Sequence, residues 1–299
     1  MKKGDIILAA IFILSLLLVI TLELLSPIGE GIQLGPSAQT DVRLQIGNAA
    51  PAITNINPLS NIDLSPGSTR DVVVTFTARD PNGAADLNDA TAAASFSSTG
   101  EPSRTAPSCA RTSELGKERT YQCAVTMQYY DKSGLWDVAV SINDQGSVTA
   151  QGASQITINL LRDLSIGPAT IGFPTLVQGG IDIVSSQNTL ITNNGNAEVP
   201  SNSLEIIASN LLGETNPAES IPAANFRASS SLEANVCATG STLINNVAVP
   251  ISSAALPRGQ AGSNTGELSY CIASVPESIS SQFYSTSAIG GQSWTITLN

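Results

Sequence analysis

Histidine is absent from all 299 residues of the sequence. Its absence excludes Ser-His-Asp and Cys-His nucleophile systems, imidazole metal ligands and a proton shuttle that titrates near neutral pH. Gly-rich phosphate loops of the Walker or Rossmann type are missing as well. We therefore predict a protein without catalytic activity. The alternative is an exported hydrolase that uses carboxylates alone, which would require acidic residues from distant strands to meet in a cleft.

Charge is also scarce, and basic charge is scarcest. Only 12% of the residues are charged, and 13 Lys and Arg face 24 Asp and Glu for a net charge of −11. Without a basic surface the chain has nothing to attract a phosphate backbone, so we expect no nucleic-acid partner. Hydrophobic residues reach 42%, and Ser, Thr, Asn, Ala and Gly fill much of the rest. That composition favours short strands and polar turns over long helices.

The sequence has four cysteines, and none belongs to a Cys-x-x-Cys pair of the kind that zinc and redox sites favour. An even number of cysteines in an exported chain predicts disulfides formed in an oxidising compartment. We expect Cys109 to pair with Cys123 and Cys237 with Cys271, because each pair lies inside one predicted domain. The alternative is four buried free thiols in a reducing compartment.

The N-terminus carries the longest apolar run. Residues 6–25 read IILAAIFILSLLLVITLELL, which matches the roughly 20 apolar residues that cross a bilayer. Residues 1–5 form a basic start with Lys2 and Lys3, which the positive-inside rule places on the cytoplasmic side. We therefore predict a single-pass anchor in contact with membrane lipid and an extracellular C-terminal part. A cleavable signal peptide is the alternative, but the run is long and no clear Ala-x-Ala site follows it.

Lys2-Lys3-Gly4 followed by Asp5 and the apolar run resembles the class III signal peptides of type IV pilins. In that family a short basic stretch ending in Gly is removed, and the apolar helix remains as the core of a filament. Two features depart from the family: no acidic residue stands at the fifth mature position, and Pro27 ends the helix early. A pilin-like filament subunit is therefore the alternative to an anchored surface protein.

Beyond the anchor, residues 26–40 are rich in Gly and Pro and predict a linker. Strand-like alternation then begins with Val42, Leu44 and Ile46, and it recurs along the chain between turn signals. With no helical run between the strands, we predict an all-β fold of two antiparallel β-sandwich domains, at residues 41–161 and 162–299.

Two stretches carry a more specific likeness. GLWDVAVSINDQGS at residues 134–147 and RDPNGAADL at residues 79–87 resemble immunoglobulin-like domains of the polycystic-kidney-disease type. TLITNNGNAEVPSNSLEIIASNL at residues 189–211 resembles second-domain modules of archaeal surface proteins. The resemblance implies immunoglobulin-like sandwiches, in which Trp136 lies in the core, and says nothing about function because that fold serves many.

One loop region offers a metal site. Oxygen-bearing side chains cluster within ten residues around a Gly turn: Asp80, Asn82, Asp86, Asn88 and Asp89. Asp144 follows a predicted strand that could end beside them. Calcium takes six to eight oxygen ligands in flexible loops, so we consider calcium binding by Asp80, Asn82, Asp86, Asn88 and Asp144. The alternatives are Asx residues that only cap a tight turn, and a surface acidic patch.

Two further groups suggest surface features. Tyr129 and Tyr130 form an aromatic pair, of which an alternating strand buries one and exposes the other. Glu114, Lys117, Glu118 and Arg119 make the densest charge cluster, which we interpret as a solvated hairpin end. We predict a membrane-anchored structural or adhesive protein of the cell surface, whose partners are copies of itself, surface proteins or glycans.

Overall fold

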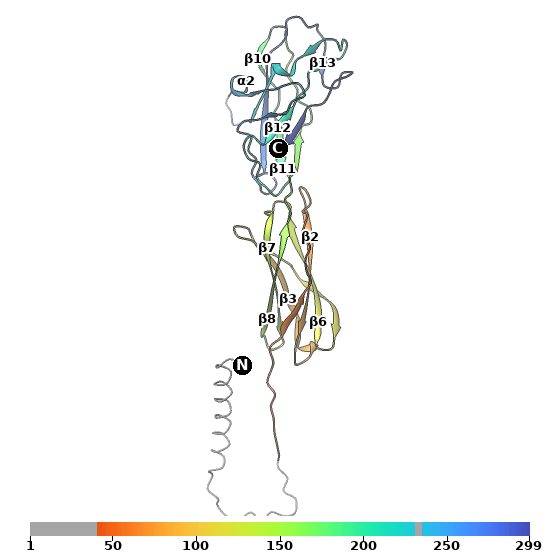
Figure 1. Cartoon of the computed structure of the whole chain (residues 1–299), viewed down its shortest axis with the longest axis vertical. Coiled ribbons are helices and arrows are strands. Elements are labelled where there is room, and N and C mark those ends of the chain that lie inside the picture. The colour runs from red at the N-terminus through yellow and green to blue at the C-terminus, as the bar shows by residue number, and fades with distance from the viewer. Residues whose placement is uncertain (1–40, 231–234) are drawn as a thin grey trace, which may run out of the picture. The chain divides into compact units, whose positions relative to one another are not determined.

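A computed structural model of the chain describes residues 41–230 and 235–299 (Figure 1). Residues Asn48–Asn299 form one compact unit, distinct from the residues up to Gly47. The predicted basic start, membrane helix and linker, at residues 1–5, 6–25 and 26–40, lie outside the described residues. Within the described ranges, no helix combines the length and the apolar composition that a bilayer crossing requires.

The fold is all-β, and every pairing between the labelled strands of the described residues is antiparallel. We call strands β1 to β8 the N-terminal half. They are β1 (Ala52–Ile56), β2 (Thr69–Arg79), β3 (Leu87–Ser97), β4 (Arg104–Thr105), β5 (Cys109–Leu115), β6 (Glu118–Gln128), β7 (Gly134–Asp144) and β8 (Thr149–Ile158), with the 3-10 turn η1 (Ala84–Asp86) before β3.

The N-terminal half consists of two four-stranded sheets, ordered β1-β2-β6-β5 and β4-β3-β7-β8. Buried side chains from both sheets form a single apolar core, which includes Phe76 of β2, Tyr121 of β6, Phe96 of β3 and Trp136 of β7. The two sheets therefore pack face to face, and their strand ends carry the connecting loops (Figure 1).

Strand β7 shows how the sequence produces this core. Trp136, Val138, Val140 and Ile142 alternate with smaller or polar residues, and each of the four is at most 1% exposed. Successive side chains of a strand point to opposite faces, so all four enter the core together. The Trp136 indole N–H also donates a 2.8 Å hydrogen bond to the Lys132 carbonyl, which satisfies its one polar group.

Strands β9 to β20 form the C-terminal half. They are β9 (Leu164–Gly167), β10 (Ile181–Val184), β11 (Thr189–Asn193), β12 (Leu204–Ile207), β13 (Leu211–Gly213), β14 (Ser220–Ile221), β15 (Phe226–Ser230), β16 (Ser241–Thr242), β17 (Val249–Pro250), β18 (Thr265–Ser274), β19 (Tyr284–Ser285) and β20 (Thr295–Leu298). The helical turns η2 (Ala223–Asn225) and α2 (Val236–Thr239) lie between strands.

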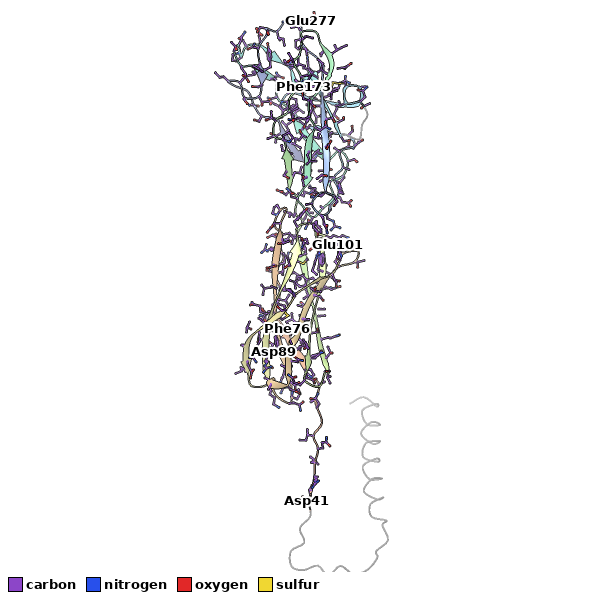
Figure 2. All side chains as sticks on the ribbon, turned by 180° about the vertical axis from the view of Figure 1, so that it is seen from behind. Asp41, Phe76, Asp89, Glu101, Phe173 and Glu277 are labelled. Atoms are coloured by element: carbon purple, nitrogen blue, oxygen red, sulfur yellow. A yellow bond between two sulfur atoms is a disulfide. The ribbon has the colours of Figure 1, made fainter. Side chains whose placement is uncertain are left out.

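The largest sheet of the C-terminal half has the order β16-β15-β18-β11-β9, and β10 also pairs with β18. Two three-stranded sheets, β17-β12-β20 and β14-β13-β19, complete it. A second apolar core contains Leu204, Phe226 and Tyr270, with Phe173 and Trp294 packed against it. Figure 2 labels one side chain at each core, Phe76 and Phe173.

Two disulfides cross-link the fold, one in each half. Cys109 and Cys123 join directly opposite positions of β5 and β6, and Cys237 joins α2 to Cys271 of β18. These are the two pairs that the sequence predicts. No free cysteine remains.

The first predicted strand is wrong. Val42, Leu44 and Ile46 alternate as a strand would, but residues 41–47 have no strand structure, and these three side chains are 80%, 85% and 86% exposed. A strand requires a neighbour for its backbone groups, and the N-terminal sheet instead begins at β1, which pairs with β2. Alternation alone therefore does not create a strand at this position.

Candidate metal centre

The candidate site is formed by two connections at one end of the N-terminal half. The first runs from Asp80 to Asp86 and links β2 of one sheet to β3 of the other. The second is the turn after Asp144, between β7 and β8. The Gln145 amide donates a 2.7 Å hydrogen bond to the Asp86 carbonyl, which joins the two connections.

Local turn chemistry shapes both connections. The Asn82 amide donates to Asp80 Oδ1 at 2.7 Å, an Asx turn, and Gly83 follows with φ of 133°, where a side chain would be strained. In the second connection, the Val148 amide donates to Asp144 Oδ1 at 2.8 Å. The turn chemistry that the sequence offered as an alternative to calcium is therefore present, but it uses only part of each carboxylate.

Three carboxylates converge where the connections meet. One oxygen from each of Asp80, Asp86 and Asp144 lies within 4.8 Å of an oxygen from each of the other two. Asp80 is 0% exposed and Asp144 is 1% exposed, while Asp86 is half-buried. The described ion pairs include none of the three. The group therefore concentrates negative charge that no described ion pair neutralises, and the Lys117 ammonium donates to the carbonyl of the neighbouring Pro81 instead of to a carboxylate.

The hydrogen bonds of these carboxylates are incomplete. Both oxygens of Asp144 accept one hydrogen bond, Oδ1 from Val148 and Oδ2 from the Asn48 side-chain amide at 2.7 Å, and each oxygen keeps a second lone pair for a ligand. Asp80 Oδ2 is buried without any hydrogen-bond partner. A buried carboxylate oxygen that lacks a partner is costly and rare in folded proteins, so it requires an explanation.

Crowding of like charges also affects Asp86. Its pKa is raised above the ordinary aspartate value, first by desolvation and then by repulsion from Asp80 and Asp144. The three side chains thus form a site in which a cation would relieve both the repulsion and the unpaired oxygen.

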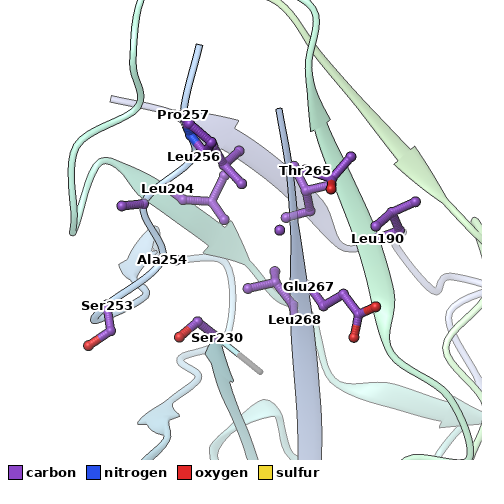
Figure 3. Close-up of a pocket in the computed structure, with 13 residues that line it drawn as sticks. Leu190, Leu204, Ser230, Ser253, Ala254, Leu256, Pro257, Thr265, Glu267 and Leu268 are labelled. Atoms are coloured by element: carbon purple, nitrogen blue, oxygen red, sulfur yellow. The ribbon is translucent and has the colours of Figure 1, made fainter. Parts of the chain in front are cut away.

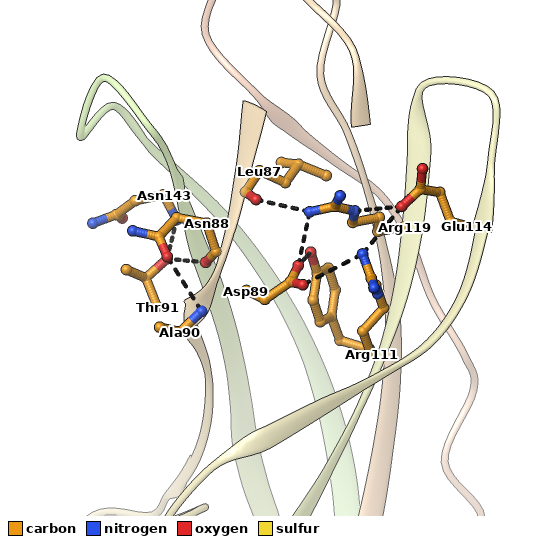
Figure 4. A network of polar contacts seen from close by, with 10 residues as sticks. Leu87, Asn88, Asp89, Ala90, Thr91, Arg111, Glu114, Arg119 and Asn143 are labelled. Atoms are coloured by element: carbon orange, nitrogen blue, oxygen red, sulfur yellow. Dashed lines mark hydrogen bonds and ion pairs between the residues drawn. The ribbon is translucent and has the colours of Figure 1, made fainter. Parts of the chain in front are cut away.

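Of the five calcium ligands that the sequence suggested, the structure brings the three aspartates together, and the two asparagines make other hydrogen bonds. Asn82 stays beside the centre, but its side-chain oxygen accepts the Ala49 amide at 2.8 Å. Asn88 makes local hydrogen bonds: its side chain accepts the Ala90 amide at 3.3 Å, and its carbonyl accepts the Thr91 hydroxyl at 2.8 Å (Figure 4). It pairs with Asn143 in the sheet, next to Asp144, and its role as a ligand stays a prediction.

Asn48 is the member that sequence reasoning missed. It stands 96 positions before Asp144 and holds that carboxylate from the segment that precedes β1. Gly146 permits the approach, since a Cβ at this position would lie 2.7 Å from the Asn48 amide nitrogen. In the sequence, Asn48 is only an asparagine shortly before a strand, and this pattern is too common to indicate a site.

A second polar cluster surrounds Arg119 (Figure 4). Its guanidinium donates to the Leu87 carbonyl, Asp89 and Glu114 at 2.9, 3.0 and 2.9 Å. The Tyr121 hydroxyl donates to the same Asp89 at 2.6 Å, and burial raises the pKa of this phenol. The interpretation of Arg119 as part of a solvated hairpin end is therefore wrong: it is buried, because β6 carries it toward the facing strand β3. The Arg119 guanidinium is thus held by two carboxylates and a backbone carbonyl, which accounts for its burial.

The two tyrosines differ in burial, but both lie in the turn after β6 and not in an alternating strand, and neither is fully exposed. Tyr129 is buried and Tyr130 is half-buried. The Tyr129 hydroxyl accepts the Asn264 side-chain amide at 3.0 Å, and the Arg104 guanidinium lies 5.7 Å from the centre of the Tyr130 ring. Both rings are thus engaged within the chain.

A cavity of about 370 Å³ opens in the C-terminal half, between β11, β18 and the segment Ser253–Pro257 (Figure 3). Its lining includes the leucines Leu190, Leu204, Leu256 and Leu268. Glu267 is its only carboxylate. Acid–base hydrolysis needs a second titratable group in reach, and the lining of this cavity provides none.

One other group of potential metal ligands exists in the described residues, namely Asp182, Cys237 and Cys271. The two cysteines are joined in a disulfide, so neither offers a thiolate to a metal. This leaves the three aspartates as the candidate centre.

Comparisons with known proteins leave the chain without a family. No family model matches it, and no curated protein matches it. Among solved structures it is similar to the secreted serine protease VesC from Vibrio cholerae, at 9% identity and a TM-score of 0.22. That alignment covers 83% of this chain, which spans about half (51%) of the length of VesC. Such a likeness carries no argument about fold or activity, and the resemblance to polycystic-kidney-disease-type domains stays a prediction.

Proposed function

We propose that the chain is a membrane-anchored structural or adhesive protein of the cell surface, without catalytic activity. The observation that carries this proposal is the pair of disulfides, Cys109–Cys123 and Cys237–Cys271, one in each half. Disulfides persist in oxidising compartments and are rare where glutathione and thioredoxin keep thiols reduced. Their presence supports export of both halves.

The proposed architecture is a tandem of immunoglobulin-like sandwiches at residues 41–161 and 162–299. Support comes from the cores: described residues up to Leu161 contribute to the first, and residues from Leu164 onward contribute to the second. Sandwiches of this type recur as spacers and binding modules because their sheets are rigid and their loops are free to vary.

Polar contacts link the two halves, as a spacer that has to keep its domains in register would require. Arg258 of the C-terminal half forms a bidentate pair with Glu101, at 2.7 and 3.0 Å, and also donates to the Tyr130 carbonyl. The Arg258 guanidinium holds the pKa of Glu101 below its usual range. Bidentate, partly buried pairs of this kind are stronger and more directional than ordinary surface ion pairs.

The anchor in this proposal is the apolar run at residues 6–25, with Lys2 and Lys3 on the cytoplasmic side and residues 26–40 as the linker. An enzymatic role has less support, because the chain lacks histidine and the Figure 3 cavity offers a single carboxylate. Copies of the same chain, surface proteins and glycans are the proposed partners.

The second candidate is a pilin-like subunit that assembles through the same apolar run. Lys2-Lys3-Gly4 followed by Asp5 favours it, since this is the form of a pilin processing site. In that case the helix would pack against other helices in a filament, and residues 1–4 would be removed.

N-terminal sequencing of the protein purified from its native membrane separates the two candidates. We expect an intact start that includes Lys2 and Lys3, with the protein in the membrane fraction. A start at Asp5 would favour the filament. Recovery from the soluble cytoplasm with four reduced thiols would contradict both.

A further inference from the structure

We propose that Asp80, Asp86 and Asp144 bind one calcium ion. The ion would join both sheets of the N-terminal half and secure the segment that leads into them. Calcium binding by these side chains does not depend on where the chain resides, so it goes beyond the proposed function and can be tested separately.

The unpaired oxygen of Asp80 is the strongest indication. Asp80 is 0% exposed, one of its oxygens accepts the Asn82 amide, and the other has no partner. An ionised carboxylate is costly to bury unless it is paired or coordinates a metal. No described basic side chain forms an ion pair with Asp80, and a bound cation would supply the missing partner of its second oxygen.

The separation of the carboxylates fits a single ion. Calcium lies 2.3–2.6 Å from its oxygen ligands, so two ligands on opposite sides of one ion are about 4.6–5.2 Å apart. One oxygen from each of Asp80, Asp86 and Asp144 lies within 4.8 Å of the other two. Three carboxylates that were merely tolerated on a surface would spread apart to reduce their repulsion.

The chemistry of the site favours calcium over magnesium. All three ligands are carboxylate oxygens, two from the connection between β2 and β3 and one from the end of β7, and calcium accepts variable geometry with six to eight ligands. Magnesium requires a nearly ideal octahedron at about 2.0–2.1 Å and gives up its water reluctantly. Three carboxylates leave several positions for water, which suits the affinity of about 0.1–1 mM found in extracellular calcium modules.

The ion would also stabilise the segment before β1, which contains Asn48 and Ala49. Asn48 donates to Asp144 Oδ2, and the Ala49 amide donates to the Asn82 side chain, which belongs to the Asp80 turn. Both contacts hold the segment before β1 to residues that shape the centre. Without the ion, repulsion among the three carboxylates would loosen the two connections and with them the entry segment.

Thermal unfolding of the full chain in detergent tests the proposal. After removal of divalent ions with a chelator, the melting temperature is compared without added metal, with calcium and with magnesium, each at about 10 mM. At a hundredfold excess over its dissociation constant, calcium should raise the melting temperature by roughly 5–10 °C. Magnesium should have a much smaller effect.

Asp86→Asn provides the decisive variant, because the half-buried side chain keeps its size and its remaining oxygen can still accept from the Gln145 backbone, so the neutral form should fold. We expect Asp86→Asn to melt at the same temperature as the wild type or higher in chelator, since one repelling charge is gone. Calcium should then raise its melting temperature by less than about 2 °C. Asp137→Asn is the matched control: Asp137 is an exposed residue of the same strand β7, and this variant should keep the full calcium response.

Hydrogen exchange of the peptide that contains Asn48 and Ala49 tests whether calcium stabilises the segment before β1. Calcium should slow its exchange about tenfold in the wild type and not in Asp86→Asn. A wild-type melting temperature that is equal in calcium and chelator would overturn the proposal, as would an unchanged calcium response in Asp86→Asn. If magnesium raised the melting temperature as much as calcium, the choice of calcium would be overturned. If calcium left the hydrogen exchange of the Asn48–Ala49 peptide unchanged, the proposed stabilisation of the segment before β1 would be overturned.

Discussion

Replacing Trp136 with alanine is expected to destabilise the chain by roughly 3–5 kcal/mol, the range for removing a large aromatic side chain from a core. Trp136 is fully buried in strand β7, and its indole N–H donates to the Lys132 carbonyl. The alanine would leave a cavity and would also leave that carbonyl without its partner. The measurement is urea unfolding of the full chain in detergent, followed by circular dichroism.

Leu135→Ala is the matched control, because Leu135 is the preceding residue of the same strand and is 56% exposed on the opposite face. Its cost should stay within about 0.5 kcal/mol. Should Trp136→Ala fail to fold, Trp136→Phe provides the measurement, with an expected loss of about 1–3 kcal/mol from the missing hydrogen bond and reduced volume. Equal effects at positions 135 and 136 would contradict the assignment of this strand's buried face.

Removing the Cys237–Cys271 disulfide by double alanine substitution should cost about 4 kcal/mol, and removing Cys109–Cys123 should cost about 3 kcal/mol. The reason is loop length: the first bond closes a loop with a sequence separation of 34, and the second closes one of 14. A cross-link over a longer loop removes more conformations from the unfolded chain. Urea midpoints of the two double variants give the comparison.

The local structure reinforces this order. The helical turn α2 is only four residues long and is held to β18 by the Cys237–Cys271 bond. By contrast, Cys109 and Cys123 face each other in an antiparallel pair whose backbone hydrogen bonds remain after reduction. A larger cost for the Cys109–Cys123 variant would show that loop length does not govern the stability of this chain.

Much of the fold follows from alternation in the sequence. The apolar residues of β7 and the β2 residues Val72, Val74 and Phe76 are buried as their period of two predicts. The same pattern at Val42, Leu44 and Ile46 predicted a strand that is not formed, since none of the described strands pairs with residues 41–47. Periodicity indicates what a strand would bury, and long-range pairing decides whether the strand forms.

Short strands were harder to predict. β5 (Cys109–Leu115) carries polar and charged residues along an edge, so its sequence has no apolar face to detect. β15 (Phe226–Ser230) has mostly small buried residues, which look like a loop in sequence. Both strands exist because a neighbour, β6 or β18, provides the backbone partners.

The candidate centre was predictable only in part, because sequence shows which residues are near neighbours along the chain and not which distant residues meet. Asp80, Asn82 and Asp86 are close in sequence, and Asp144 follows a strand, so their gathering could be proposed before the structure was known. Asn48 could not, because its contact with Asp144 spans 96 positions. Asn88 was included because it is close in sequence, and its side chain accepts a local hydrogen bond from the Ala90 amide.

Lysine labelling of intact cells with a membrane-impermeant amine reagent tests the central claim most directly. The chain has four lysines: Lys2 and Lys3 precede the apolar run, and Lys117 and Lys132 lie exposed in the N-terminal half. An anchored surface protein predicts modification of Lys117 and Lys132 with Lys2 and Lys3 present and unmodified. Protection of Lys117 and Lys132 until the cells are lysed would contradict a surface location.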